Sequence, residues 1–274
     1  MTARILITGA GGVVGTLMRS RLAAEGRVLR LLDIAELPAA AEGENAEIVQ
    51  ASVTDMAAME AALKDVDAVI HLGGHSLEES WDKILRVNID GTHTVLEAAR
   101  RSGVRRVVLA SSNHAVGYVE RADGVAGDYL FPRPDTYYGV SKVAMEALGS
   151  LYADRYGMDV LAIRIGSCFE KPRDVRMLAT WLSPDDGARL FEACLSVPSP
   201  GFRIAWGVSK NTRGWFSHDE ARALGFEPRD DSEVFAAEVL ARHGELDPST
   251  YAAKYVGGAW CGPDFDTAVK EAGR

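Results

Sequence analysis

Apolar and polar residues alternate along the first two-thirds of the chain in blocks that favour strands and helices in turn. Short runs rich in Val, Ile and Leu are typical of buried strands, and longer stretches with helical periodicity separate them. The expected strands are residues 4–8, 27–32, 46–50, 68–72, 107–111 and 160–165, and the expected helices are 15–25, 56–63, 81–102 and 136–156. Six strands separated by helices predict an α/β fold with a doubly wound, Rossmann-type parallel sheet.

The pattern loosens after residue 165, where prolines interrupt shorter segments. Two further helices are expected there, over residues 184–194 and 231–243. We therefore expect a sheet domain over residues 1–165 and a small lobe over residues 166–274 that covers the carboxyl edge of the sheet. The chain of 274 residues, 47% hydrophobic, is long enough to bury one substantial core.

Composition and charge narrow the class of protein. The formal net charge of -9 leaves no basic surface of the kind that binds nucleic acid. No apolar run is long enough to span a bilayer, and the N-terminal residues lead almost directly into a strand, which predicts a cytoplasmic protein without membrane contact. Three cysteines without CxxC spacing and six histidines without a ligand motif predict neither a disulfide framework nor a metal site.

A glycine-rich segment joins the first expected strand to the first expected helix. Such glycines permit a tight turn and let the backbone approach a diphosphate at the helix N-terminus, although they also serve simple strand-helix packing. The dinucleotide interpretation assigns to the cofactor the residues Gly9, Gly12, Val13, Val14 and Gly15.

The ends of the next strands complete a groove for the cofactor. Asp33 ends the second strand, where a carboxylate can accept hydrogen bonds from a ribose and would repel a 2'-phosphate. The next residue, Ile34, is followed by no arginine that could neutralise such a phosphate, so the pattern favours NAD over NADP. The alternative for Asp33 is a solvated residue at a strand end. Further loop residues fit the same groove, with ordinary loop positions as the alternative: Ser52, Val53, Leu72, Gly73 and Gly74.

The chemistry-bearing pair is Tyr138 and Lys142, four positions apart on the expected helix 136–156, for which Asp135 is the expected N-cap. At 3.6 residues per turn both side chains point to one face. A buried cation beside a phenol favours the phenolate, which can act as a base. The strand end at Ser112 can supply a hydroxyl to the reacting oxygen. The alternative is an exposed helix on which the two residues coincide by chance.

Taken in order, these motifs resemble those of the extended short-chain dehydrogenases, over about residues 3–170. The set is the glycine turn, Asp33, Asn88 in Val-Asn-Ile-Asp-Gly-Thr, Ser112 and the Tyr138-xxx-Lys142 pair. Longer stretches resemble the uronate dehydrogenases across nearly the whole chain, namely Ser-Ser-Asn-His at 111–114, Arg-Pro-Asp at 133–135, Tyr-Gly-Val-Ser-Lys at 138–142, Arg-Ile-Gly-Ser-Cys at 164–168 and Arg-Met-Leu-x-Thr-Trp at 176–181.

The resemblance implies a role for each matching residue. Tyr138 is implied as the general base, Lys142 as the group that holds the nicotinamide ribose and lowers the pKa of the tyrosine, and Ser112 as the residue that orients the substrate hydroxyl. Asn88 is implied as a structural or relay residue on the cofactor side, and Cys168 as a neighbour of the nicotinamide. Ser52 departs from the family, which commonly has an aspartate there. The residues implied to contact a sugar acid are Ser76, Ser112, Asn113, His114, Ser167 and Arg176.

Three functions stay open at this point. The first is NAD-dependent oxidation of the anomeric hydroxyl of D-galacturonate or D-glucuronate, the second a nucleotide-sugar epimerase or dehydratase that retains its NAD, and the third a non-catalytic NAD-binding sensor. Without the resemblance, His114, Arg176 and Cys168 would be interpreted as ordinary loop, surface and core residues. Trp260 and three other tryptophans are expected in the core. By analogy with the superfamily, a homo-oligomer is expected.

Overall fold

One parallel sheet organises the chain. The computed structural model describes residues 3–265, and its seven-stranded sheet has the order β3-β2-β1-β4-β5-β6-β9. All neighbouring strands are parallel. The strands are β1 (Ala3–Thr8), β2 (Arg27–Asp33), β3 (Ala46–Gln50), β4 (Ala68–His71), β5 (Arg106–Ser112), β6 (Asp159–Ile165) and β9 (Phe202–Gly207). This order confirms the predicted doubly wound fold, with the switch point between β1 and β4.

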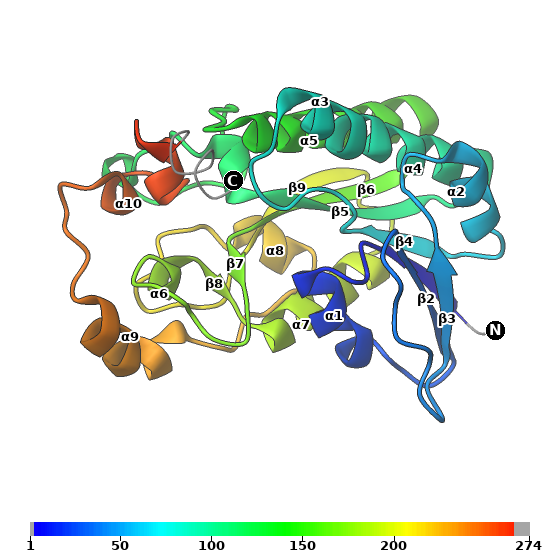
Figure 1. The fold of residues 1–274 in the computed structure, drawn as a ribbon, viewed down its shortest axis with the longest axis horizontal. Helices are drawn as coiled ribbons and strands as arrows, with labels where there is room; N and C mark the ends of the chain where they lie inside the picture. Colours follow the sequence, from blue (N-terminus) through cyan, green and yellow to red (C-terminus); the bar gives the residue numbers. More distant parts are fainter. Residues whose placement is uncertain (1–2, 266–274) are drawn as a thin grey trace.

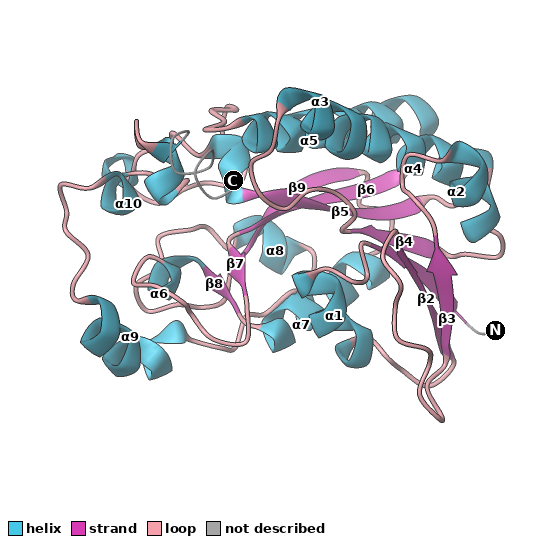
Figure 2. Cartoon of the chain, in the orientation of Figure 1, coloured by secondary structure: helices cyan, strands magenta, loops and turns pink. Residues whose placement is uncertain are grey.

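Helices cover both faces of the sheet (Figures 1 and 2). One face carries α2 (Met56–Ala62), α4 (Asp90–Arg101) and α5 (Tyr137–Tyr156), and the other carries α1 (Val13–Arg21), α7 (Pro184–Ser196) and α8 (Asp219–Ala223). The expected helix 81–102 is a composite of α3 (Trp81–Lys83), a π-helical segment η1 (Ile84–Ile89) and α4. Within residues 3–265, no helix is long and apolar enough to cross a membrane.

Alternate side chains of each strand supply the two halves of the core. Ile5 and Ile7 of β1 belong to the half that includes Met18 of α1, whereas Leu6 between them belongs to the half that includes Met59 of α2. A strand buried on both faces has a nearly continuous apolar sequence, which is why these strands are visible in the chain. The carboxyl ends of the strands consequently meet at one rigid edge.

The strand β9 is the element that the hydrophobic pattern missed. It pairs with β6 from Val160↔Phe202 to Ile165↔Gly207, although it lies in a proline-rich part of the chain. Prolines at 198 and 200 directly precede it, and Arg203 is its second residue, so the hydrophobic pattern did not mark it as a strand. The two predicted segments, 1–165 and 166–274, therefore share one sheet.

The remaining C-terminal elements lie beyond the carboxyl edge of the sheet (Figure 1). They begin with the short parallel pair β7 (Ser167–Cys168) and β8 (Trp181–Leu182), with α6 (Met177–Thr180) between them. The expected helix 231–243 starts as a 3-10 turn, η4 (Ser232–Phe235), and continues as α9 (Ala236–His243). The last described elements are α10 (Tyr251–Lys254) and the 3-10 turn η5 (Gly258–Cys261).

Candidate active site

The turn between β1 and α1 brings the backbone close to a neighbouring loop. Gly9 has a φ of 69°, and a Cβ atom on it would lie 2.6 Å from the backbone of the loop after β4. A Cβ atom on Gly15 would collide with the carbonyl oxygen of Gly9. Gly12 is the N-cap residue of α1 and has no side chain to cap the helix, and Val13 and Val14 form its first turn. The helix N-terminus is therefore open to an anion such as a diphosphate.

Asp33 lies at the carboxyl end of β2, beside this turn. One of its carboxylate oxygens accepts a hydrogen bond from the backbone N–H of Gly11 at 2.8 Å, and the other accepts from that of Ala35 at 2.9 Å. These two bonds fix the orientation of the carboxylate. Ile34, the next residue, is 72% exposed, so its side chain leaves the space beside the Asp33 carboxylate open. The turn and the carboxylate together fit the diphosphate and ribose of a dinucleotide.

The loops after β3 and β4 border the same turn. A Cβ atom on Gly73 would lie 2.8 Å from the side chain of Val53, so the two loops pack closely. The Ser52 hydroxyl forms hydrogen bonds with the hydroxyl and the backbone N–H of the residue two positions on. Leu72 is half-buried, and Gly74 has a φ of 151°, which favours glycine. The structure thus brings all five predicted loop positions to the rim of the glycine turn.

Asn88 lies in the π-helical segment and is buried. Its amide donates to the carbonyl of His75 at 3.0 Å and to the hydroxyl of Ser141 at 3.1 Å, and it accepts from the N–H of His75 at 2.8 Å. Both amide hydrogens are therefore used within the protein. Asn88 joins the loop after β4 to α5, which is the structural role among the alternatives that the resemblance implies.

The helix α5 carries the expected pair near its N-terminus. Its N-cap residue is Thr136, whose hydroxyl accepts a hydrogen bond from the N–H of Gly139 at 3.0 Å. The expectation that Asp135 is the N-cap was wrong, because the Asp135 carboxylate is engaged by His114 instead. Tyr138 is consequently in the first turn of α5, and its side chain is buried between the helix and the end of β5.

Tyr138 and Lys142 are 8% and 6% exposed. The Lys142 ammonium lies 5.2 Å from the centroid of the tyrosine ring and donates to the carbonyl of Ala110 at 2.7 Å. Burial raises the pKa of Tyr138 to about 12, against the lowering effect of the Ser112 hydroxyl. Burial also lowers the pKa of Lys142 to about 8, against the raising effect of Glu146. The tyrosine therefore becomes a base only with positive charge next to it.

The residues after β5 line the other side of the tyrosine. The Ser112 hydroxyl accepts from the N–H of His114 at 3.2 Å, and the buried Asn113 side chain donates to the carbonyl of Val256 at 3.1 Å. The His114 ring lies edge-on to Tyr138, with centroids 5.8 Å apart. Burial lowers the pKa of His114, while Asp135 raises it. Ser112 and His114 thus lie beside the Tyr138 side chain on one short turn.

Two residues that the sequence analysis did not assign to the site, Trp260 and Glu78, complete this region. Trp260 stacks on His114 at 4.0 Å between centroids and meets Tyr138 edge-on at 5.9 Å. Glu78 accepts hydrogen bonds from the N–H groups of Tyr137 and Tyr138, at 3.1 and 2.7 Å. The expectation of a core role for Trp260 was wrong, since it is only half-buried and its ring stacks on His114 at the site. No local motif marks either residue, because each is brought to the site from a distant part of the chain.

Arg176 lies at the start of α6, where burial lowers its pKa. Its guanidinium donates to the carbonyl of Val256, and within residues 3–265 it forms no ion pair. A Cβ atom on Gly258, which has a φ of 67°, would collide with the guanidinium. Its charge acts on the pKa of His114, which places it near the same site. A half-buried guanidinium that pairs with no carboxylate among residues 3–265 is suited to an anionic ligand.

The remaining predicted residues lie at the edge of this region. The Ser167 hydroxyl forms a hydrogen bond with that of Thr180 at 3.0 Å. Burial raises the pKa of the Cys168 thiol to about 12, so the thiol stays protonated. Ser76 is exposed, and it lies on the same loop as Glu78, whose carboxylate accepts hydrogen bonds from the N-terminus of α5. In the described part of the chain, no group of three or more His, Cys, Asp or Glu side chains could hold a metal ion.

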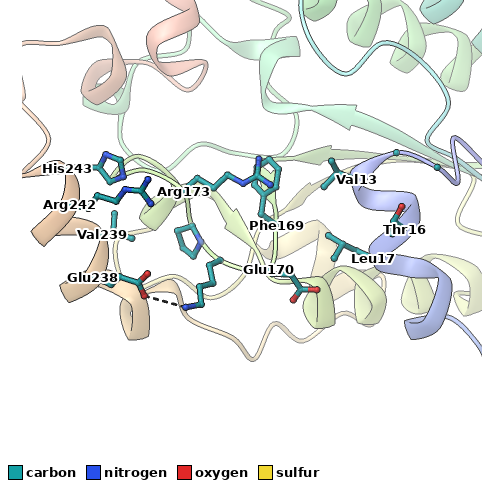
Figure 3. A pocket seen from close by; sticks show the side chains of 14 residues that line it. Val13, Thr16, Leu17, Phe169, Glu170, Arg173, Glu238, Val239, Arg242 and His243 are labelled. Carbon is teal, nitrogen blue, oxygen red and sulfur yellow. Dashed lines mark hydrogen bonds and ion pairs between the residues drawn. The ribbon is translucent and has the colours of Figure 1, made fainter.

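The cavities lie beside the predicted contacts rather than on the tyrosine. A cavity of about 860 Å³ separates the N-terminal turn of α1 from α9 and the loop that contains Phe169 and Arg173 (Figure 3). It shares Gly12 and Val13 with the predicted cofactor residues. Arg176 lines a different cavity of about 430 Å³. The site is therefore defined by its side-chain contacts, and the cavity of about 860 Å³ adjoins the glycine turn predicted to hold a diphosphate.

Comparisons with known proteins agree on one family. The model of the NAD dependent epimerase/dehydratase family matches residues 5–182. Uronate dehydrogenase of Pseudomonas putida is 43% identical over 94% of this chain and 95% of its own length. The crystal structure of a mutant uronate dehydrogenase from Agrobacterium tumefaciens, complexed with NAD, is 38% identical with a TM-score of 0.90, covering 96% of this chain and 98% of the other. The crystal structure of glucuronic acid dehydrogenase from Chromohalobacter salexigens is 42% identical with a TM-score of 0.90, covering 95% of this chain and 97% of the other.

Proposed function

We propose, from the premise that this chain belongs to the NAD dependent epimerase/dehydratase family, that it is an NAD-dependent uronate dehydrogenase. The reaction is oxidation of the anomeric C1 hydroxyl of cyclic D-galacturonate or D-glucuronate to the aldarolactone, with release of NADH. The observation that carries the substrate class is Arg176, a half-buried cation without an ion-pair partner in residues 3–265, near the His114 ring beside Tyr138.

Each side chain has a defined task in this reaction. Tyr138 takes the proton of the C1 hydroxyl, Ser112 orients that hydroxyl, and Lys142 provides the positive charge that a phenolate needs in a buried site. NAD, when bound, accepts the hydride that leaves C1. Loss of one proton and one hydride converts the C1–OH of the ring into the lactone carbonyl, so the balance closes without a metal or an added base.

Arg176 determines which carbon faces the tyrosine. A guanidinium can pair with a carboxylate through two parallel hydrogen bonds, which fixes orientation as well as position. Binding of the C6 carboxylate by Arg176 therefore fixes how the ring lies in the site and which ring carbon, C1, faces Tyr138. In this assignment the sheet and its loops hold the cofactor, and residues 166–274 supply the group that recognises the sugar acid.

A spectrophotometric assay tests the proposal. Purified protein is mixed with NAD and, in turn, galacturonate, glucuronate, galactose, glucose and a uridine diphosphate sugar, and the absorbance of NADH is followed. We expect NADH to accumulate with the two uronates only. A nucleotide-sugar epimerase or dehydratase would retain its cofactor and release no NADH, and a non-catalytic sensor would bind NAD without turnover. Equal rates with uronates and neutral sugars would refute a carboxylate-reading site.

Assembly is a separate prediction. The superfamily analogy leads us to propose a homo-oligomer that pairs through the helices α4 and α5. Sedimentation of the purified protein measures the mass directly, and a monomer at micromolar concentration would contradict it.

A further inference from the structure

The Asp135 carboxylate occupies a pocket that is built for it. Its side chain is 0% exposed. A Cβ atom on Gly117 or on Gly257 would collide with its Oδ2 atom, and one on Gly139 would lie 3.0 Å from Oδ1. Three glycines from separate segments thus leave room for this carboxylate. A buried carboxylate of this kind persists only where hydrogen-bonding partners compensate for the lost hydration.

The partners of Asp135 fix the hydrogen positions around it. The Oδ2 atom lies 2.6 Å from Nδ1 of His114, and the hydroxyl of Thr136 donates to Oδ1 at 3.0 Å. An ionised carboxylate only accepts, so Nδ1 of His114 must carry a hydrogen. In a neutral imidazole the other nitrogen, Nε2, is then an acceptor. Within residues 3–265 no hydrogen bond is formed by Nε2, which leaves this acceptor for a ligand.

The surroundings of His114 favour the neutral ring. The titratable and charged groups that act on it are Asp135, Glu78, Arg176 and the edge-on Tyr138. Burial is the largest influence and lowers the pKa of His114; Arg176 acts in the same direction, whereas the two carboxylates oppose it. A neutral His114 at physiological pH therefore keeps one donor toward Asp135 and one acceptor toward the site.

We propose that Asp135 is a positioning residue that holds His114 in the Nδ1–H tautomer, so that Nε2 accepts a hydrogen bond from one ring hydroxyl of the sugar acid. The inference rests on the proposed function. The inference adds a rule for substrate specificity. Nε2 of His114 recognises a hydroxyl that donates a hydrogen bond, and the site therefore disfavours a sugar without that hydroxyl. Trp260, stacked on the same ring at 4.0 Å, restricts the imidazole to this plane.

His114 also contacts Ser112, whose hydroxyl is proposed to orient the reacting group of the substrate. The backbone N–H of His114 donates to Ser112 at 3.2 Å, so a rotation of His114 would disturb the Ser112 oxygen as well. A purely structural role for Asp135 would affect all substrates alike. A positioning role affects only those substrates that offer the recognised hydroxyl, and this difference separates the two.

The test uses Asp135→Asn, which preserves shape while its amide can donate to Nδ1. His114 would then carry its hydrogen on Nε2 and present a donor where the substrate needs an acceptor. We expect kcat/KM for galacturonate to fall about 10- to 100-fold, roughly the range for leaving buried hydrogen-bonding groups without a partner. The dissociation constant for NAD should stay within about twofold, within the scatter expected of an independent site.

Monodeoxy uronates provide the specific readout. For the wild type, removal of the recognised hydroxyl should lower kcat/KM; for Asp135→Asn, the same removal should have little further effect, as in a double-mutant cycle between enzyme and substrate. The matched control is Asp186→Asn, another fully buried aspartate, whose carboxylate binds Arg189 and the backbone of residues 229 and 230. This control should keep the wild-type pattern of deoxy substrates.

Nitrogen NMR of the imidazoles measures the tautomer without reference to activity, with His114→Gln identifying the signal. We expect Nδ1–H in the wild type and Nε2–H in Asp135→Asn. An Nε2–H tautomer in the wild type would overturn the inference even if Asp135→Asn failed to fold. Equal sensitivity of both proteins to every deoxy substrate would overturn it as well. Failure of wild-type protein to form NADH from any uronate would instead refute the proposed function, while the tautomer remained decisive for Asp135.

Discussion

A buried ion pair lies one helical turn from Lys142, within the same helix as the proposed catalytic pair. Glu146, one helical turn after Lys142, accepts two hydrogen bonds from Arg164 at 2.8 and 2.7 Å and one from the Ser111 hydroxyl at 2.6 Å. The side chains of Arg164 and Glu146 are 1% and 6% exposed. Arg164 also donates to the carbonyl of Asp128 at 3.0 Å. This pair joins α5 to β5 and β6 at the level of the active site.

Replacement of Glu146 by Gln leaves the Arg164 guanidinium buried without its counter-ion. Breaking a buried pair by removing one partner costs about 3 to 5 kcal/mol. At roughly 2 to 4 °C per kcal/mol for a chain of this size, the melting temperature should fall by about 6 to 20 °C. The second effect is electrostatic: Glu146 raises the pKa of Lys142, which burial holds at about 8, so its loss lowers that pKa further.

The sign of the activity change follows from the charge that catalysis requires. Lys142 supports the phenolate only while protonated, and activity is lost as the pH rises through the pKa of Lys142. In Glu146→Gln this loss should begin at a lower pH than in the wild type. The measurement is kcat/KM for galacturonate between about pH 6 and pH 10, below the melting temperature of the variant.

A surface carboxylate provides the control. Glu60 pairs with Arg101 at 3.1 Å, and both side chains are about half exposed, at 41% and 50%. Glu60→Gln should cost no more than about 1 kcal/mol and leave the pH profile unchanged. If Glu146→Gln kept the wild-type alkaline limb while its melting temperature fell, the pair would stabilise the fold but have no influence on the charge of Lys142.

Three further outcomes are expected from single replacements. Tyr138→Phe should lower kcat by about 10²- to 10⁴-fold with the NAD dissociation constant nearly unchanged, and near-normal turnover would remove Tyr138 from the mechanism. The wild type should prefer NAD over NADP in kcat/KM, a preference that Asp33→Ala should weaken; equal values in the wild type would show that Asp33 does not face the ribose. Arg176→Ala should weaken uronate binding by about 30- to 3,000-fold, corresponding to about 2 to 5 kcal/mol, while Arg176→Lys should recover part of the lost affinity. If Arg176→Ala kept the preference for uronates over neutral sugars, Arg176 would not be the residue that binds the carboxylate.

The sequence predicts those parts of the molecule whose determinants are local. The six strands from β1 to β6 are short segments rich in Val, Ile and Leu, and the pair Tyr138 and Lys142 follows from helical spacing. The glycine turn and Asp33 sit where the chain leaves strands, and parallel strands bring such ends together. Placement along the chain therefore implied placement in space for these residues.

Other features depend on contacts between distant segments. The strand β9 directly follows the prolines at 198 and 200, and it is recognisable as a strand only once β6 offers it an edge. Asp135 resembles an N-cap by position, but His114 engages its carboxylate and Thr136 caps the helix instead. Local propensity was overridden there by a tertiary hydrogen bond.

The C-terminal segment shows how the two halves of the site depend on each other. The carbonyl of Val256 accepts hydrogen bonds both from Asn113, after β5, and from Arg176, at the start of α6. One peptide group thus connects the turn that follows Ser112 to the cation proposed to bind the sugar carboxylate. Trp260, four residues further on, meets Tyr138 edge-on. A substitution that moves the Val256 carbonyl should therefore change the distance between carboxylate and C1 that the site accepts. The glycine turn and Asp33 are left intact by such a substitution. Substrate preference can then change without loss of cofactor binding.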